Sequence, residues 1–597
     1  MTRRRARHRP SGGARAAPSP VPAPDLASAA EVAPRWYVLF LCALVFAIYG
    51  RCLGHGFLSW DDTTHILDNP LIVPPDLGKL PDLWRAPIFN LYVPVAYSAW
   101  ALLARASVAL LGRVSPGAFV LANLALHAAN AVLVLWLLRR LLGKGRGVAS
   151  AALAGAALFA AHPLAVQAVA WISALRDLLG TTVLLGALHV WLGAFDGRRF
   201  AIRPARLGVL AALGALSLLC KPSAVALPAL SFVLARLVLG TSTRTAIVSA
   251  LPATVLALPA VIITRALQPT VEVGVDVALL LRPVIALDAL AFYTGKLLLP
   301  IGLVADHGRS PAQVLGSGQA TWTWLVPAVA AALAVGLRQK LPLAPAAALL
   351  FAFALAPVLG LVPFSYQSYS TVADHYAYLA LFGPALLVAA ALARWPARPL
   401  RWAAWAVVAL LSAASLVQAG SWRDDLTLFS RVLVANPASY AAENNLGRAL
   451  ATAGRADEAM ACYQRALVLR PGDPIALSNI GETLLGRGQV ALADQHYARV
   501  LQERVPAGNN GPVFSKMRTN HAAALFQLGR VAEAMDELDR ALALDPKNPD
   551  AHHNRGAILL NTGRVREALP SLQRAVELAP TRPLFVENLA KARAALR

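Results

Sequence analysis

Long apolar runs dominate the first 420 residues and constrain the fold more than any other feature. A helix crosses the hydrocarbon core of a bilayer with about 20 apolar residues. Thirteen runs approach or reach that length, near residues 35–53, 92–112, 118–138, 147–161, 174–195, 207–220, 222–240, 246–264, 283–303, 321–337, 342–362, 376–394 and 401–419. Only 15% of the residues are charged, against about 25% in an average soluble chain. The sequence excludes a purely soluble protein and predicts an all-α polytopic membrane bundle.

Clusters of basic residues indicate how this bundle is threaded. The clusters lie between apolar runs, at residues 139–146, 198–206, 244, 338–340 and 394–401. Loops rich in Lys and Arg are cytoplasmic, and all five clusters can be cytoplasmic only if two runs do not cross. We assign the runs 92–112 and 283–303, which carry Arg105, Asp288 and Lys296, to the outer leaflet surface. Eleven spanning helices are then expected in the cell membrane, with the N-terminus cytoplasmic and the C-terminal region periplasmic.

The N-terminal segment is also basic, because six arginines precede a stretch of Pro, Ala and Ser. A segment of that composition cannot form a core, so residues 1–34 are expected to be a disordered cytoplasmic tail. The net charge of +23 is spread over this tail and the clusters that flank apolar runs. We therefore expect membrane lipid, and no nucleic acid, as the partner of these charges.

Residues 421–597 form a second domain after the membrane domain of residues 35–420. A period of 34 residues relates Asn445 to Asn479 and Gly454 to Gly488. The same period relates Pro437 to Pro471, Asn520 to Asn554, Gly529 to Gly563, and Pro546 to Pro580. This period, with a glycine in the middle and a closing proline, is typical of tetratricopeptide repeats. Four units are expected at 438–471, 472–505, 513–546 and 547–580, with an insertion of about seven residues after the second and a final helix at 584–597.

Such repeats stack into a short right-handed solenoid with a concave groove. The groove could present an extended acceptor polypeptide to a membrane site, or it could serve as a scaffold for a partner protein. The repeats alone do not distinguish these two functions.

The most informative polar segment follows the first apolar run and reads Trp60-Asp61-Asp62. Adjacent carboxylates repel each other and lose hydration when buried, so they are usually solvated, hydrogen-bonded, bound to a metal or catalytic. In an extended segment their side chains point to opposite sides. We therefore expect one of them to face a substrate and the other to structure the loop, unless both belong to a helix cap or a solvated turn.

Other polar groups lie at the same predicted outer side. His162 and Pro163 mark a helix start, and Arg176 lies where the next helix enters the membrane. Lys221, before Pro222, interrupts an apolar stretch. Each cation could bind an anionic group or simply anchor a helix at the headgroups. Asp374, His375 and Tyr376 could bind a sugar or a phosphate, or belong to a helix cap and an aromatic belt.

The order of these motifs resembles the transmembrane and tetratricopeptide repeat-containing O-mannosyltransferases, and more broadly the multi-spanning GT-C glycosyltransferases. The residues that carry the resemblance are Trp60-Asp61-Asp62, His162-Pro163, Arg176-Asp177-Leu178-Leu179, Lys221-Pro222 and Ala373-Asp374-His375-Tyr376-Ala377-Tyr378-Leu379, followed by the repeats. The resemblance implies transfer of a sugar, mannose or another hexose, from a polyprenyl-phosphate carrier to a Ser or Thr hydroxyl of a protein, with inversion. The chain departs from the family at Gln167, where an acidic residue is common, and at His375, where Arg is common.

The resemblance also implies roles for these residues. Asp62, or failing that Asp61, is the expected general base for the acceptor hydroxyl. Arg176, Lys221 and His375 are expected at the departing phosphate, and the predicted substrate-binding residues are His162, Asp374 and Tyr376. No metal or other cofactor is expected, and no metal-ligand spacing or phosphate-binding glycine loop occurs. The alternatives are a scaffold without enzymatic activity, and the same fold acting on a lipid or a glycan.

Overall fold

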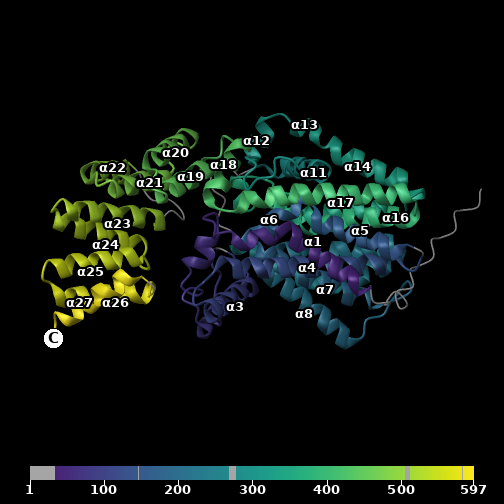
Figure 1. The fold of residues 1–597 in the computed structure, drawn as a ribbon, viewed down its shortest axis with the longest axis horizontal. Helices are drawn as coiled ribbons and strands as arrows, with labels where there is room; N and C mark the ends of the chain where they lie inside the picture. The colour runs from purple at the N-terminus through teal and green to yellow at the C-terminus, as the bar shows by residue number, and fades with distance from the viewer. Residues whose placement is uncertain (1–33, 90, 146, 268–276, 504–510, 581) are drawn as a thin grey trace, which may run out of the picture.

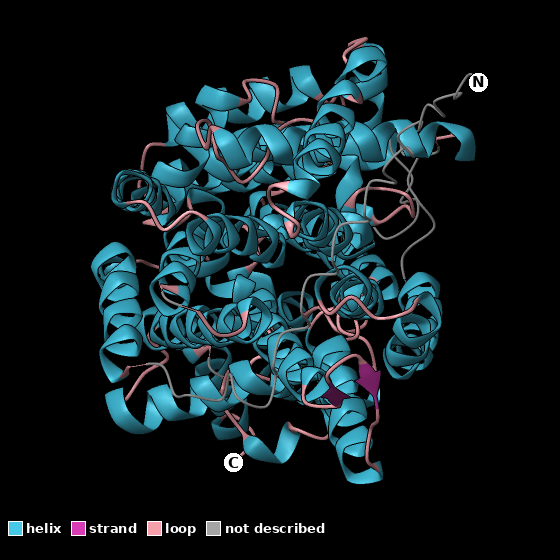
Figure 2. Ribbon diagram, turned by 90° about the vertical axis from the view of Figure 1, so that its right-hand side faces the viewer, coloured by secondary structure: helices cyan, strands magenta, loops and turns pink. Residues whose placement is uncertain are grey.

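The computed structural model describes residues 34–89, 91–145, 147–267, 277–503, 511–580 and 582–597. These residues form a helical bundle and a helical solenoid beside it (Figure 1). The described part contains one small sheet, in which β1 (Phe195–Asp196) pairs antiparallel with β2 (Arg199–Phe200) at the edge of the bundle (Figure 2). The predicted all-α class is confirmed. Residues 1–33 of the predicted tail and the insertion at 504–510 lie outside the described residues.

The bundle contains the helices up to α17. They are α1 (Arg35–Tyr49), α2 (Asp82–Arg85), α3 (Pro94–Leu111), α4 (Pro116–Leu142), α5 (Val148–Ala161), α6 (Val166–Ala170), α7 (Leu175–Leu192), α8 (Pro204–Cys220), α9 (Leu227–Val233), α10 (Thr243–Leu267), α11 (Arg282–Leu298), α12 (Pro311–Gly316), α13 (Ala320–Thr323), α14 (Leu325–Gly336), α15 (Ala344–Leu355), α16 (Phe382–Arg394) and α17 (Arg398–Ala419). Proline occupies the first turn of many of them, where its missing N–H costs no helical hydrogen bond. These prolines help to set where the helices begin.

Eight helices among the described residues are long and apolar enough to cross a membrane. A ninth span results if Val148–Ala161 and Pro163–Ala170, which are bent by 52° against each other, are counted as one. Three shorter apolar helices lie at Pro204–Cys220, Pro222–Val238 and Ala344–Val358. Of the two helices that the sequence analysis assigns to the outer leaflet surface, α3 is among the eight and α11 is not. Helix α3 lies at the end of the bundle that faces the solenoid (Figure 1). Because the candidate spans are identified by length and composition alone, the count of eleven spans stays a prediction.

The loops with basic clusters gather at the end of the bundle away from the solenoid. The Arg140 guanidinium donates a hydrogen bond to the His189 carbonyl at 2.8 Å, which joins the ends of α4 and α7. Arg401 lies against Gly147, and Arg198 lies against Gly240. Because α17 runs from this end to the solenoid (Figure 1), the basic loops and the repeats lie at opposite ends of the bundle.

The solenoid consists of four helix pairs between two single helices. The pairs are α19 (Tyr440–Thr452) with α20 (Ala456–Leu469), α21 (Pro474–Gly486) with α22 (Val490–Glu503), α23 (Gly511–Gln527) with α24 (Val531–Leu544), and α25 (Pro549–Asn561) with α26 (Val565–Leu578). They coincide with the four predicted units, and α27 (Pro583–Ala594) follows them as the predicted final helix. The repeat signature has a physical reason, because Gly454 in the first turn has a φ of +78°, which glycine adopts without steric cost.

Helix α18 (Asp425–Ala435), which the sequence pattern did not predict as part of the repeats, joins the two parts of the molecule. Its Leu428, Phe429 and Val432 are buried in the same apolar core as the membrane bundle. The Ser439 hydroxyl, just before α19, donates a hydrogen bond of 2.5 Å to the Asp306 carboxylate of the bundle. The solenoid is therefore packed against the bundle by buried apolar surface and buried hydrogen bonds.

Candidate active site

The loop after α1 is held in place by the base of the solenoid. The Gly56 N–H donates to the Arg423 carbonyl at 3.1 Å. The Ser59 N–H donates to the Asp425 carboxylate at 2.9 Å, and the Ser59 carbonyl accepts a hydrogen bond of 3.2 Å from Arg448. Both backbone groups of Ser59, two residues before Asp61, are thus bound by residues of the solenoid.

Asp62 is fully buried and binds the loop to the segment before α7. Its carboxylate accepts hydrogen bonds from the Leu58 N–H at 2.9 Å, the Ser173 N–H at 2.9 Å and the Ser173 hydroxyl at 2.5 Å. Burial raises the pKa of Asp62 to about 7, although these three hydrogen bonds act in the opposite direction. The carboxylate of Asp62, the first predicted base, is thus bound within the loop and to Ser173, and Asp62 is not among the residues that line the cavity next to Asp61.

Asp61 faces the other way, into a cavity, and its side chain is 32% exposed. The Arg176 guanidinium donates to its carboxylate at 3.3 Å. Burial raises the pKa of Asp61, while the charge of Arg176 lowers it. One carboxylate of the pair thus faces the cavity and the other is internal, and the cavity-facing one is Asp61 rather than Asp62, which the sequence analysis named first. The segment is a turn rather than an extended strand, because the Asp62 N–H donates to the Leu58 carbonyl at 3.1 Å.

The cavity has a volume of about 510 Å³ and lies between the bundle and the solenoid. Its walls come from the loop after α1, the region around the start of α7, an aromatic segment before α16, and the first helices of three repeats. The lining residues are Ser59, Trp60, Asp61, Thr63, Thr64, Gln167, Trp171, Arg176, Tyr366, Tyr369, His375, Tyr376, Tyr440, Ala441, Asn444, Asn445, Arg448, Ile475, Asn479 and Lys516. The cavity therefore offers a carboxylate, an arginine and aromatic rings, the kinds of side chain that a sugar and an anionic group require.

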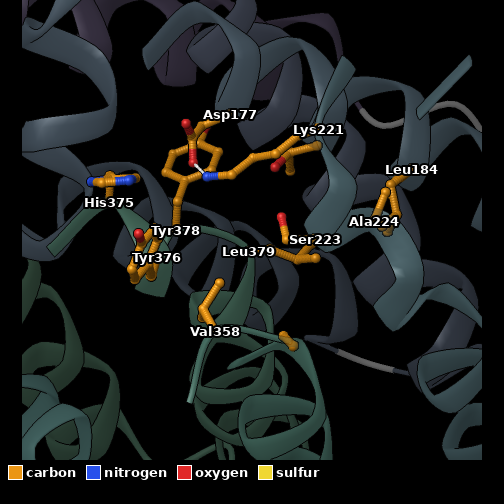
Figure 3. Close-up of a pocket in the computed structure, with 12 residues that line it drawn as sticks. Asp177, Leu184, Lys221, Ser223, Ala224, Val358, His375, Tyr376, Tyr378 and Leu379 are labelled. Carbon is orange, nitrogen blue, oxygen red and sulfur yellow. Dashed lines mark hydrogen bonds and ion pairs between the residues drawn. The ribbon is translucent and has the colours of Figure 1, made fainter. Parts of the chain in front are cut away.

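A smaller cavity of about 30 Å³ lies behind the first, and His375 and Tyr376 line both. Figure 3 shows the Lys221 ammonium directed at the Asp177 carboxylate, with which it forms an ion pair. The ammonium also lies 5.4 Å from the centroid of the Tyr376 ring. The predicted cations Arg176 and Lys221 thus line one cavity each, and the two cavities share His375 and Tyr376.

The two positions that depart from the family pattern contact each other. The Gln167 side-chain oxygen accepts a hydrogen bond of 2.9 Å from the His375 N–H. The His375 ring is buried and packs edge-on against Trp171, with 5.5 Å between centroids. Within the described residues, the His375 Nδ1 atom has no hydrogen-bond partner. His375 therefore contributes a buried ring to the cavity wall, and its Nδ1 atom is not bound to a carboxylate.

Two predicted substrate-binding residues do not line either cavity. His162 Nε2–H donates to the Leu297 carbonyl at 3.0 Å, and its Nδ1 accepts from the Leu164 N–H at 3.2 Å. Asp374 accepts a hydrogen bond of 2.8 Å from His307 Nε2, and both side chains are buried. In the structure His162 binds backbone groups and Asp374 binds the His307 side chain, and only Tyr376 of the three predicted residues reaches the cavity.

Buried polar groups hold the non-helical backbone beneath the cavity. The Asn123 amide donates to the carbonyls of Val169 and Trp171 at 3.2 and 3.0 Å. His127 Nε2–H donates to the Ala160 carbonyl at 3.0 Å, so its Nδ1 accepts from the Tyr378 hydroxyl at 2.7 Å. Irregular backbone at membrane depth is tolerated only where such partners are present. These side chains keep the helix breaks next to the cavity in a defined position.

Sequence reasoning missed the cavity wall that the solenoid contributes. Tyr440, Arg448, Asn479 and Lys516 line the cavity, but no local pattern distinguishes them from other positions of the repeats. Tyr440 stacks on Tyr369 of the aromatic segment, with 5.8 Å between ring centroids. Among the described residues, no group of three His, Cys, Asp or Glu side chains is arranged to hold a metal ion.

Comparison with known families identifies the solenoid. The TPR repeat family matches residues 522–563, and the Tetratricopeptide repeat family matches residues 410–474 and 549–582. These matches confirm the predicted tetratricopeptide repeats. The match to residues 410–474 begins inside α17, so it includes α18, which the sequence pattern had not assigned to a repeat.

One curated relative and many solved structures are similar to parts of the chain. The Protein O-mannosyl-transferase Tmtc2 of Drosophila melanogaster is 32% identical over 200 residues, which cover 31% of this chain. The chain spans about a fifth of that relative's length, since the match covers 20% of it. This similarity agrees with the resemblance that the sequence motifs indicated.

Solved structures of TPR proteins match about a third of the chain. YrrB, described as a TPR protein with an unusual peptide-binding site, is 21% identical with a TM-score of 0.22, covering 31% of this chain and 87% of YrrB. TTC0263, a thermophilic TPR protein in Thermus thermophilus, is 22% identical with a TM-score of 0.25, covering 32% of this chain and 94% of TTC0263.

Proposed function

We propose that this chain is a membrane glycosyltransferase that moves mannose or another hexose from a polyprenyl-phosphate carrier to a Ser or Thr hydroxyl of a polypeptide. One observation carries the proposal: Asp61 and Arg176 face a single cavity that the membrane bundle and the solenoid enclose together. The similarity to an O-mannosyl-transferase supports the reaction class. The transfer proceeds with inversion, on the extracytoplasmic side.

In this proposal Asp61 is the general base. A Ser or Thr hydroxyl is a weak nucleophile, so a carboxylate within hydrogen-bond reach must accept its proton as it attacks. The oxygens of Asp62 are already bound to Leu58 and Ser173, whereas Asp61 lines the cavity. A pKa raised by burial makes the Asp61 carboxylate a stronger base than a solvated aspartate.

The reaction is a single displacement at the anomeric carbon. The bond between the acceptor oxygen and this carbon forms as the bond from the carbon to the phosphate oxygen breaks. The electron pair leaves with the polyprenyl phosphate, and the hydroxyl proton moves to Asp61. Attack from the face opposite the phosphate inverts the configuration at the anomeric carbon, and no metal is required in this scheme.

Cations near the cavity would stabilise the departing phosphate. Arg176 lines the main cavity, and Lys221 lines the smaller one behind it. Next to Lys221, Pro222 lines an apolar groove of about 250 Å³ between α8, α10 and the residues before α3. A groove of this kind suits an isoprenoid chain whose phosphate points to Lys221, which supports a lipid-linked donor.

The distribution of basic residues supports the proposed side of the membrane. Loops rich in Lys and Arg are cytoplasmic, and the contacts of Arg140, Arg198 and Arg401 gather these loops at one end of the bundle. Residues of the solenoid line the cavity, and the solenoid lies at the other end of the bundle (Figure 1). The cavity and the repeats therefore belong on the extracytoplasmic side in this proposal.

The proposal is tested by product analysis. Membranes with the wild-type chain, or with no such chain, are given polyprenyl phosphate carrying a labelled hexose. We expect label on protein that mild alkali releases from Ser or Thr, and an anomeric linkage opposite to that of the donor. Label that appears only on lipid or glycan, or equally in both membranes, would contradict the proposal.

A further inference from the structure

The residues that line the main cavity are suited to a saccharide. Six of the twenty are Trp or Tyr, four carry side-chain amides, and Ala441 and Ile475 are the only aliphatic ones among the described residues. A hexose presents C–H groups on the faces of its ring and hydroxyl groups at the rim. The electronegative faces of aromatic rings attract such C–H groups, and amides both donate to and accept from hydroxyls. The lining therefore matches a saccharide in both respects.

The aromatic side chains of the main cavity form a continuous file. It begins at the proposed base, because the guanidinium of Arg176, which contacts Asp61, lies 5.7 Å from the centroid of the Trp171 ring. Neighbouring ring centroids along the file are 4.3–6.1 Å apart, in the order Trp171, His375, Tyr376, Tyr366, Tyr369 and Tyr440. Tyr440 is the first residue of α19. The file therefore runs from the proposed reaction centre to the solenoid.

The far end of the file consists of three distal tyrosines, Tyr366, Tyr369 and Tyr440. The first two lie within and just after one 3₁₀ turn, in which side chains three residues apart project from the same side. The Tyr366 hydroxyl donates to the Ala305 carbonyl at 2.9 Å, and the Tyr440 hydroxyl accepts from Arg470 at 2.7 Å. All three tyrosines are partly exposed. The distal tyrosines are thus a preformed platform in the cavity wall.

The proposed transfer to a Ser or Thr hydroxyl leaves this platform without a role. In that reaction the donor phosphate lies at Arg176 and Lys221, so the donor hexose lies next to Asp61. The cavity volume of about 510 Å³ is within the range of about 300–1,000 Å³ that encloses drug-sized ligands, and a single hexose is smaller than such ligands. The distal tyrosines therefore line space beyond the donor hexose, on the side of the acceptor.

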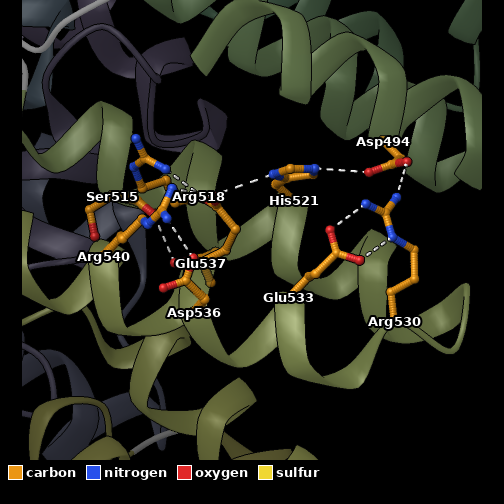
Figure 4. A network of polar contacts seen from close by, with 10 residues as sticks. Asp494, Ser515, Arg518, His521, Arg530, Glu533, Asp536, Glu537 and Arg540 are labelled. Atoms are coloured by element: carbon orange, nitrogen blue, oxygen red, sulfur yellow. Dashed lines mark hydrogen bonds and ion pairs between the residues drawn. The ribbon is translucent and has the colours of Figure 1, made fainter. Parts of the chain in front are cut away.

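The solenoid wall of this space is fixed before a ligand binds. Helix α23 contributes Lys516 to the cavity. Figure 4 shows the His521 ring of α23 placed between the carboxylates of Asp494 on α22 and Glu537 on α24. Arg518 of α23 also donates to Glu537 at 2.7 Å. These contacts hold the third repeat against the second, so the space beside the distal tyrosines is preformed.

We propose that the distal tyrosines form a second hexose subsite, on the acceptor side of Asp61, and that the protein also transfers a hexose to a hexose already attached to a polypeptide. The inference rests on the proposed hexose transfer and adds a second class of acceptor to it. The attached hexose packs on the distal tyrosines and directs one of its hydroxyls to Asp61.

The second transfer uses the same groups as the first. A hydroxyl oxygen of the attached hexose forms a bond to the anomeric carbon of the donor hexose as the bond from this carbon to the phosphate oxygen breaks. The electron pair leaves with the polyprenyl phosphate, and the hydroxyl proton moves to Asp61. The product is a dihexosyl polypeptide, and no further reactant is needed.

The test uses two acceptors that differ by one hexose. Both are alanine-rich peptides with a single serine, which is free in one and carries a hexose in the other, so only hexose hydroxyls can accept in the second. The purified full-length protein in detergent is given polyprenyl phosphate carrying a labelled hexose, and the products are identified by mass spectrometry. We expect label on the free serine and a dihexosyl product from the hexosyl-peptide.

Variants of the distal tyrosines distinguish the subsite from the reaction centre. Tyr369→Ala should raise the KM for the hexosyl-peptide about tenfold, which corresponds to about 1.4 kcal/mol, and leave kcat and KM for the free-serine peptide close to wild type. Tyr369→Phe keeps the ring and should retain most of the affinity, and Tyr440→Ala is a second variant if Tyr369→Ala folds poorly. Trp322→Ala, which removes an exposed ring of α13, should change neither KM.

Binding is measured separately, by titration of fluorescent forms of both peptides. We expect a lower Kd for the hexosyl-peptide than for the free-serine peptide, and Tyr369→Ala should abolish this difference. Equal Kd for both peptides, label on the free serine without any dihexosyl product, or an unchanged KM in both tyrosine variants overturns the inference. Tyr369-dependent binding of the hexosyl-peptide without transfer to either peptide supports the subsite and contradicts the proposed reaction.

Discussion

The carboxylate of Asp62 accepts both the N–H and the hydroxyl of Ser173, at 2.9 and 2.5 Å, although 111 residues separate the two in sequence. Ser173 lies just before α7, the helix whose Arg176 contacts Asp61. The contact thus holds the loop with the proposed base against the helix with the proposed phosphate ligand. Asp62 is therefore a positioning residue for the proposed reaction.

Asp62→Asn tests this role through stability and pH. Asparagine cannot accept from both Leu58 and Ser173 with its two side-chain atoms, so the variant should lose about 1–3 kcal/mol at pH 5. The folded-state pKa of Asp62 is raised from 3.8 to about 7. Its stabilising contribution is complete below pH 4 and is lost as pH rises through 7. The difference in Tm between wild type and variant in detergent should shrink from pH 5 to pH 8; a difference that grows over this range would contradict the assignment.

Asp425→Ala should impair catalysis without impairing acceptor binding. The variant removes the acceptor of the Ser59 N–H, so the loop before Asp61 loses a contact with the solenoid. We expect kcat for a short peptide to fall about tenfold, the loss typical when a catalytic group is displaced by a fraction of an ångström, at unchanged KM.

Two variants serve as controls for this prediction. Asp425→Asn keeps an oxygen that can accept from Ser59 and should restore most of the rate. Asp424→Ala removes the neighbouring cap, which accepts from the Thr427 N–H, and should lower stability without changing kcat. Equal losses of kcat in Asp424→Ala and Asp425→Ala would show that α18 acts only through stability.

Variants of the Lys221–Asp177 ion pair distinguish a structural role of Lys221 from a role in donor binding. Lys221→Met leaves Asp177 unpaired although its side chain is only 4% exposed, which should cost about 3–5 kcal/mol. The double variant with Asp177→Asn should recover folded protein. If Lys221 helps to bind the donor phosphate, the double variant keeps a KM for the polyprenyl-phosphate hexose at least about tenfold above wild type. A wild-type donor KM in the double variant would assign Lys221 to structure alone.

The orientation of the chain is tested by cysteine accessibility. In a background without the four native cysteines, Gln464→Cys places a thiol on the exposed face of α20, and Lys144→Cys places one in a basic loop. A maleimide that cannot cross membranes should label Gln464→Cys in intact spheroplasts, and Lys144→Cys only after permeabilisation. The reverse pattern would place the repeats in the cytoplasm.

The helices and the repeats were predictable because their signals are local. Apolar runs and the glycine at 454 with its positive φ follow from periodicity and from the backbone conformation of one turn. The sequence also predicted that Asp61 and Asp62 face different environments. It named Asp62 first as the base, whereas Asp61 lines the cavity, because the orientation of the pair depends on the distant Ser173.

Long-range packing explains what sequence reasoning missed or misplaced. Asp374 was predicted to bind substrate, but it pairs with His307, 67 residues away. The wall formed by Tyr440 and Asn479 exists because the solenoid packs on the bundle through α18. No sequence pattern within a repeat indicates that the solenoid packs on the bundle.

The role of Asp61 is tested by comparing wild type with Asp61→Asn for transfer of a labelled hexose from polyprenyl phosphate to protein in membranes. Asparagine conserves the shape of the side chain and removes the base. If Asp61 accepts the hydroxyl proton, the variant loses at least roughly a hundredfold in kcat, the low end for a general base, while its thermal stability stays close to that of wild type. Transfer by Asp61→Asn at the wild-type rate would contradict the assignment of Asp61 as the base.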